Sequence, residues 1–210
     1  RFLINNNLGF LAANKLDKVS IKAGLDKALR LTKRSARIGD KIELSSEPIS
    51  KKSYKVKQKK DVRDIGPDEK IKILTDLDKA TTAQHKYFSL SDHLSKKYYI
   101  NSEGSRISSE IPRINFFYLM TLIEGDQSIQ RMNQYGSTTG YESIKNWKLE
   151  NNIQNEMIAL KKNMLEGIKA PTEKIDVICA PEVTGIATHE SCGHPYEADR
   201  MLGRESAQAG

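Results

Sequence analysis

The chain has 210 residues, of which 38% are hydrophobic and 29% charged, a composition that is ordinary for a soluble globular protein and excludes an intrinsically disordered chain. No apolar run approaches the roughly 18 residues needed to cross a bilayer, and the amino end lacks the pattern of a secretory signal. The formal net charge is +7, but the basic residues are scattered, so a solvated surface is favoured over a specific nucleic-acid groove.

The amino-terminal third predicts a hairpin, a helix and a linker. In residues 2–13, an asparagine run separates two short apolar segments, and asparagine tolerates the left-handed backbone of a tight turn. Asp17 is a candidate N-cap for a helix that ends near Ala36 and packs an apolar stripe on the hairpin. The stripe consists of residues at helical spacing: Ile21, Leu25, Ala28, Leu29 and Thr32. Residues 38–66 are polar and lysine-rich and are interpreted as a linker with edge strands, within which the basic run 51–60 is solvated.

The middle of the chain predicts an antiparallel sheet with flanking helices. Pro67 suits the first turn of a helix that ends near Thr82. Its core face is expected to contain Ile71, Leu74 and Leu77. Apolar residues at period two then predict strands on both sides of a turn at 101–104. The strongest strand, at 114–123, is apolar on both faces and ends at a turn with Gly125, so we expect it to be the central strand of a meander.

The last third predicts a long helix, a short strand and a second helix. From about Trp147 to Ile168, apolar residues are spaced by three or four, as in an amphipathic helix that Pro171 closes. The apolar positions are Ile153, Met157, Leu160, Met164 and Ile168. Residues 177–179 then predict a short buried strand, and Pro181 begins a helix that continues into the motif described next.

The residues that carry chemistry lie in the hexamer His189-Glu190-Ser191-Cys192-Gly193-His194. A zinc peptidase requires imidazole ligands on one metal, an open position for water, and a carboxylate that takes the water's proton. His189 and His194 are candidate metal ligands, and Glu190 is the candidate catalytic carboxylate. The familiar H-E-x-x-H spacing is four, whereas here it is five, which would separate the two histidines by roughly 140° on a regular helix. We therefore expect a π-bulge or widened turn at Gly193, beside Pro195.

Two interpretations of this hexamer remain open at this stage. In one, the chain is a metal-dependent peptidase. In the other, it is a non-catalytic interaction module in which the histidine pair binds metal only to close the fold. Replacement of Glu190 separates them, because a catalytic carboxylate is needed for cleavage and not for metal binding.

Other polar residues are assigned lesser roles. The two cysteines are too few for a disulfide framework, which fits reduced thiols in a cytoplasmic protein. Cys179 is predicted to be a core residue, and Cys192 to be a packing residue, because simultaneous coordination from between two ligands is geometrically awkward. The surface histidines of the sheet are expected to be His85 and His93. Glu197 and Asp199 either orient an imidazole N–H or are solvated charges.

Several segments together resemble the TldD/PmbA family of metallopeptidases. Near the motif these are Ala180-Pro181-Glu182, His189-Glu190, Gly193-His194 and Glu197-Ala198-Asp199. Earlier in the chain, similar features are Leu8-Gly9-Phe10 in the hairpin, the turn Asn101-Ser102-Glu103-Gly104, and the helix leading to Pro171 before Asp176-Val177. The resemblance spans most of the chain, with the HExxxH hexamer and the trailing Glu197 and Asp199 as its specific part.

The resemblance implies a cytoplasmic metalloprotease that hydrolyses unfolded or extended peptides. It implies a dimer, either with a related metal-less subunit of the TldE/PmbA type or with itself. The HExxxH motif makes the chain similar to the catalytic TldD type, with zinc, or alternatively iron, as its metal. The family's third metal ligand is a cysteine far downstream of residue 210, so this chain is expected to be inactive by itself. Because the first residue is Arg1 rather than Met and the hexamer lies close to Gly210, the chain is interpreted as a fragment cut at both ends.

The predicted fold class is α+β, with an amino-terminal hairpin plus helix and an antiparallel sheet with flanking helices. We expect three parts. Residues 1–60 are the end of an amino-terminal α/β region, residues 61–170 form the central antiparallel sheet with its helices, and residues 171–210 begin a carboxyl-terminal metal-binding peptidase domain.

Overall fold

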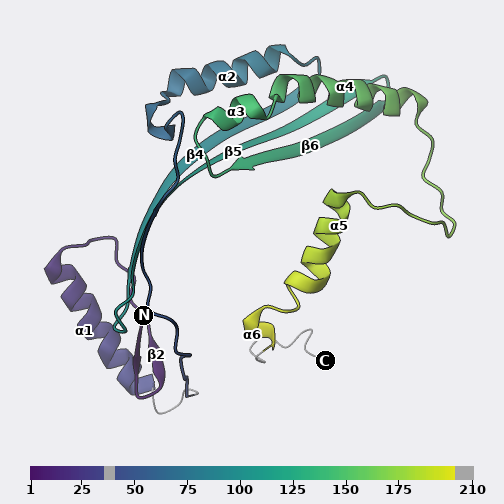
Figure 1. Ribbon diagram of the computed structural model, residues 1–210. Coiled ribbons are helices and arrows are strands. Elements are labelled where there is room, and N and C mark those ends of the chain that lie inside the picture. Colours follow the sequence, from purple (N-terminus) through teal and green to yellow (C-terminus); the bar gives the residue numbers. More distant parts are fainter. Residues whose placement is uncertain (36–40, 202–210) are drawn as a thin grey trace.

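The computed structural model describes residues 1–35 and 41–201, and it has the α+β architecture that the sequence predicts. A hairpin with one helix lies at one end, and a long curved sheet runs from there to a layer of helices (Figure 1). The last helices follow on an extended connection (Figure 1). Within the described part of the chain, no helix combines the length and the apolar character that crossing a membrane requires.

The amino-terminal hairpin consists of strands β1 (Phe2–Ile4) and β2 (Asn7–Gly9), as the asparagine run predicts. Asn5 and Asn6 have φ angles of 49° and 63°. Two consecutive residues with positive φ are what a two-residue turn of type I′ requires, and asparagine tolerates this backbone better than most residues. The turn is thus set by local sequence.

Helix α1 (Lys18–Ser35) packs against β2. The Asp17 carboxylate caps it by accepting a hydrogen bond from the backbone N–H of Ser20 at 2.8 Å, which confirms the predicted N-cap. The predicted helix end at Ala36 lies outside the described residues. From the predicted apolar stripe, the structure buries Ala28 and Thr32.

The sheet has β5 (Arg106–Glu124) at its centre. β4 (His85–Ile100) pairs antiparallel along one side of β5, whereas β3 (Lys51–Lys55) and β6 (Gln127–Ser137) pair with separate stretches of its other side. β6 is antiparallel to β5, and β3 is parallel to it. The predicted central strand is therefore confirmed, and β3 is an exposed edge strand within the predicted linker.

The sequence patterns did not predict β6, because polar residues occupy most of its length. Its contacts with the core come from Ile129 and Tyr135, which are too far apart to form an alternating apolar run. Gly125, with φ of 59°, forms the turn between β5 and β6, and Gly104, with φ of 103°, lies in the turn between β4 and β5. Both turns are at the predicted positions.

Helices cover one face of the sheet (Figure 1). They are α2 (Pro67–Lys79), α3 (Glu142–Asn146) and α4 (Leu149–Glu166), with a short 3-10 helix, η1 (Val62–Asp64), before α2. The long predicted helix is shorter than expected, since α4 begins after Lys148, whose φ is 49°, and Ile168 lies exposed beyond its end. In α2, Ile71 is 60% exposed and Ile73 packs on the core instead, so the predicted core face is partly wrong.

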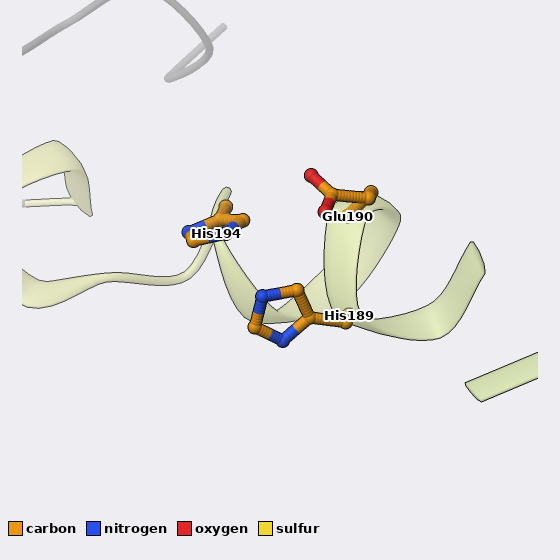
Figure 2. A group of neighbouring side chains, drawn as sticks. All are labelled: His189, Glu190 and His194. Carbon is orange, nitrogen blue, oxygen red and sulfur yellow. The ribbon is translucent and has the colours of Figure 1, made fainter. Parts of the chain in front are cut away.

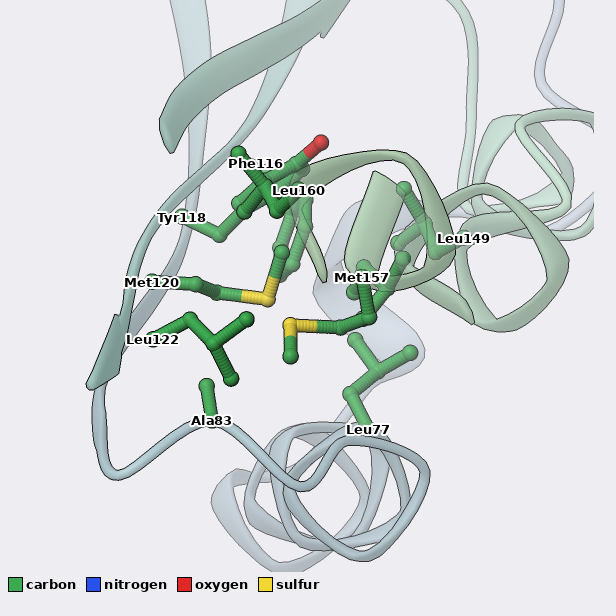
Figure 3. Close-up of a cluster of buried hydrophobic side chains, with 10 residues drawn as sticks. Leu77, Ala83, Phe116, Tyr118, Met120, Leu122, Leu149, Met157 and Leu160 are labelled. Carbon is green, nitrogen blue, oxygen red and sulfur yellow. The ribbon is translucent and has the colours of Figure 1, made fainter. Parts of the chain in front are cut away.

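The main hydrophobic core lies between β5 and these helices (Figure 3). Alternate residues of β5 are buried: Ile114, Phe116, Tyr118, Met120 and Leu122. The buried residues of α4 that belong to this core are Leu149, Ile153, Met157 and Leu160. On the opposite face of β5, Phe117 and Leu119 are half-buried and Ile123 is exposed. β5 is therefore apolar on both faces but buried on only one, which the sequence did not distinguish.

The described part of the chain ends with three short helical segments, α5 (Pro181–Thr188), the π-helical turn η2 (His189–Gly193) and α6 (Ala198–Met201). The buried strand predicted at 177–179 is wrong, since this segment is extended without strand pairing and exposed. A strand requires a hydrogen-bonding partner, and every residue from 165 to 193 is exposed. Cys179 is correspondingly exposed and not a core residue.

Candidate metal centre

The helix that begins at Pro181 widens where the motif starts. The backbone N–H of His194 donates to the carbonyl of His189 at 3.1 Å, a hydrogen bond across five residues that defines the π-turn. Such a turn accommodates one residue more than a regular α-helical turn, so positions five apart return to about the same side. The widened turn expected at Gly193 is thus present, and Pro195 follows where the helix ends.

The π-turn brings the two imidazoles together (Figure 2). The ring centroids of His189 and His194 are 4.4 Å apart, with an interplanar angle of 74°. The potential ligand atoms of His189, Glu190 and His194 all lie within 4.8 Å of one another. His189 and Glu190 are exposed and His194 is half-buried, so water and a substrate can reach all three groups.

The chemistry of these donors fits a zinc ion. Imidazole nitrogen and carboxylate oxygen are ordinary zinc ligands at about 2.0–2.2 Å, so two ligand atoms on one tetrahedral ion lie roughly 3.3 Å apart. The potential ligand atoms of the three residues lie up to 4.8 Å apart, which is more than the separation on one zinc ion. A change of side-chain rotamer can close a difference of this size. The two histidines could therefore supply two ligands to one metal ion, with a Glu190 carboxylate oxygen close to the same position.

Cysteine does not contribute to this group of ligand atoms. Cys192 lies inside the hexamer but is not among the residues whose ligand atoms gather there. It is exposed, so the predicted packing role is not seen. His85 and His93 are exposed on β4, as predicted for surface histidines of the sheet.

Glu197 contacts the second histidine directly. The Nδ1 atom of His194 and the Oε1 atom of Glu197 are 2.7 Å apart, and the second carboxylate oxygen lies 3.3 Å from Nε of Arg200. The hydrogen bond from His194 lowers the pKa of Glu197 below its ordinary value. The side chain of Asp199 lies outside what the structure describes, so its role remains a prediction.

One residue of this arrangement, Arg200, was not predicted from the sequence. Glu197 and Arg200 are three residues apart, and Ala198–Met201 forms helix α6. Opposite charges at this spacing are neighbours on a helix surface, which is the signal that the sequence offered.

Comparisons with known proteins give matches along the chain. Residues 60–165 match the family model described as the PmbA/TldA metallopeptidase central domain. The chain is 30% identical to a metalloprotease of Methanocaldococcus jannaschii, over 98% of this chain and 46% of the relative. It is 24% identical to a metalloprotease of Methanothermobacter thermautotrophicus, over 100% of this chain and 46% of the relative. It is 27% identical to a zinc metalloprotease TldD homolog of Saccharolobus solfataricus, over 96% of this chain and 44% of the relative.

The chain therefore spans about half the length of the curated relatives that it matches. No solved structure gives a significant match.

Proposed function

This chain belongs to the PmbA/TldD family of metallopeptidases, and we propose that it carries the HExxxH site of a metal-dependent peptidase of the catalytic TldD type. The observation that supports this proposal is the π-turn, which gathers the ligand atoms of His189, Glu190 and His194 within 4.8 Å. Without this turn, two histidines five positions apart could not serve one metal from a regular helix.

Each of the three residues has a role in the proposed reaction. His189 and His194 would hold the metal through one nitrogen each. The chemistry supplied there by a bound zinc ion would be polarisation of the peptide carbonyl and a lower pKa of bound water. The Glu190 carboxylate accepts a proton from the attacking water and returns it to the leaving amine. Its position beside both imidazoles and its exposure allow both proton transfers.

We further propose that the substrates are unfolded or extended peptides. Backbone hydrogen bonds along a strand edge hold an extended peptide whatever its sequence, because they do not involve side chains. The sheet offers such edges. Among the described strands, β4 is 16 residues long and pairs with β5 alone, so its other edge carries unpaired backbone groups.

The remaining features of the proposal come from the family. The name of one relative includes zinc, which supports zinc as the metal, with iron as the alternative. A cytoplasmic location, a dimer with a related subunit or with a second copy, and a third metal ligand from a cysteine downstream of residue 210 are proposed on the same basis. We also propose the division into residues 1–60, 61–170 and 171–210, and the match of the family model to residues 60–165 supports the central part.

The test is Glu190→Gln in the full-length protein. We expect metal content, measured by inductively coupled plasma mass spectrometry, to remain at the wild-type level, while cleavage of an unstructured reporter peptide falls about 10²–10⁴-fold. Glu173→Gln, which changes an exposed glutamate on the connection before α5, is the matched control and should cleave normally.

Two results would argue against the proposal. Unchanged cleavage by Glu190→Gln would show that another group supplies the proton transfer. Loss of folding and of metal together would instead favour the non-catalytic module, in which the site only stabilises the chain.

A further inference from the structure

We propose that Glu197 is a positioning residue that fixes the tautomer and the orientation of His194, so that the Nε2 atom of this histidine faces the metal. This inference rests on the proposed function, because it assumes that His194 is a ligand. Glu197 is not one of the three residues whose ligand atoms gather within 4.8 Å, so it acts through His194 and not on the metal itself.

The hydrogen-bonding chemistry of the pair determines the tautomer. The Nδ1 atom of His194 lies 2.7 Å from Oε1 of Glu197. An ionised carboxylate only accepts hydrogen bonds, so the proton between the two atoms belongs to Nδ1. An imidazole that binds a metal is neutral and carries a single N–H, so in that form the lone pair of His194 would be on Nε2. This is the nitrogen that remains available to a metal.

The backbone holds Glu197 in place for this contact. Its N–H donates to the carbonyl of His194 at 3.2 Å, so a backbone bond and a side-chain bond both connect residues 194 and 197. The carbonyl of Glu197 accepts from the N–H of Met201 at 2.9 Å, which anchors the residue at the start of α6. With the backbone of Glu197 held by these two hydrogen bonds, few rotamers of its side chain can reach Nδ1 of His194.

Arg200 restrains the other side of the carboxylate. Its Nε atom lies 3.3 Å from Oε2 of Glu197, while Oε1 faces His194. The three side chains thus form a row in which the guanidinium orients the carboxylate and the carboxylate orients the imidazole. Hydrogen-bonding partners of metal-binding histidines restrict the ring and increase its basicity, and their loss typically weakens metal binding by about 10–100-fold.

The first measurement is the tautomer of His194 in the metal-free, full-length protein, read from long-range ¹H–¹⁵N correlation spectra of the imidazole. Wild type should show the Nδ1–H form. Glu197→Ala should shift His194 toward the Nε2–H form, which removes the lone pair from the metal-facing nitrogen. His85 and His93 lie exposed on β4 and do not belong to the group around His194, so their imidazole spectra should be unaffected and serve as internal controls.

The second measurement is zinc affinity, by competition with a chromophoric chelator. We expect Glu197→Ala to weaken Zn²⁺ binding about 10–100-fold and the nearly isosteric Glu197→Gln to weaken it less, because the amide oxygen still accepts a hydrogen bond. Glu182→Ala, on the exposed surface of α5, is the control. If Glu197→Ala does not fold, Glu197→Gln alone should still show partial loss of the Nδ1–H form.

The two proposals fail in different ways. An unchanged His194 tautomer together with unchanged zinc affinity in both Glu197 variants would overturn the positioning role, whether or not the protein cleaves peptides. A shifted tautomer with weaker zinc binding would support it even if the wild-type protein proved unable to cleave any peptide, a result that would refute only the proposed function.

Discussion

Truncation of Ile153 to alanine tests whether α4 and the sheet form the main core. The Ile153 side chain is 0% exposed and lies in the cluster that includes Phe116, Tyr118 and Met120. The change removes three carbon groups, which corresponds to a transfer free energy of about 2.4 kcal/mol at ~0.8 kcal/mol each. Because β5 is paired on both sides and cannot collapse freely, we expect a residual cavity and a total loss of about 3–4 kcal/mol in the free energy of unfolding.

Urea unfolding followed by tryptophan fluorescence measures this loss. Trp147 is the single tryptophan of the chain, packs against the same cluster, and has its ring centroid 5.7 Å from that of Tyr135. Ile158→Ala is the matched control, since Ile158 lies on the same helix but is 69% exposed, and it should change stability by less than about 0.5 kcal/mol. Equal losses in Ile153→Ala and Ile158→Ala would refute the packing that we describe.

Two further substitutions test other parts of the fold. Gly140→Ala should destabilise the protein by about 1–3 kcal/mol in thermal unfolding, because the added Cβ would lie 2.3 Å from the carbonyl oxygen of Lys60. Gly136→Ala is the control, since its added Cβ would meet no atom within 4 Å and should not destabilise the protein. The Tyr141 hydroxyl donates a hydrogen bond to Asp92 at 2.9 Å. Burial is the main cause that raises the Tyr141 pKa above its ordinary value of 10, and this hydrogen bond is the second. The contribution of Tyr141 to the free energy of unfolding is therefore complete below pH 10 and declines at higher pH. Tyr141→Phe should lower the free energy of unfolding by about 1–3 kcal/mol at pH 7. In urea titrations at increasing pH, the stability of this variant should decline less steeply than that of wild type. An equally steep decline would assign the alkaline sensitivity to other groups.

Much of the candidate site was predictable because its geometry is local. His189 and His194 are five residues apart, and a regular helix cannot direct such a pair to one metal, so the spacing alone required a widened turn. The cap at Asp17 and the turn at Asn5 and Asn6 were predictable for the same reason, since each depends on residues within a few positions. The contact between His194 and Glu197 is also local, but the sequence left open whether Glu197 was solvated.

Burial was less predictable, because it depends on the segment that packs opposite. In α2, Ile71 and Ile73 are both apolar, and only the placement of the helix on the sheet decides that Ile73 faces the core. Cys179 follows apolar residues that are typical of a buried strand, yet none of the described strands pairs with them. β6 shows the reverse case, since pairing with β5 makes a strand of a largely polar segment.

The sequence by itself determined the donor groups of the site and the turn that unites them, because hydrogen bonds between near neighbours in the chain form this geometry. The tertiary structure decided which face of β5 is covered, which strand lies at each edge, and which apolar residues stay exposed. Those outcomes depend on contacts between segments that are far apart in the chain. The spacing of apolar residues within one segment does not indicate which other segment packs against it.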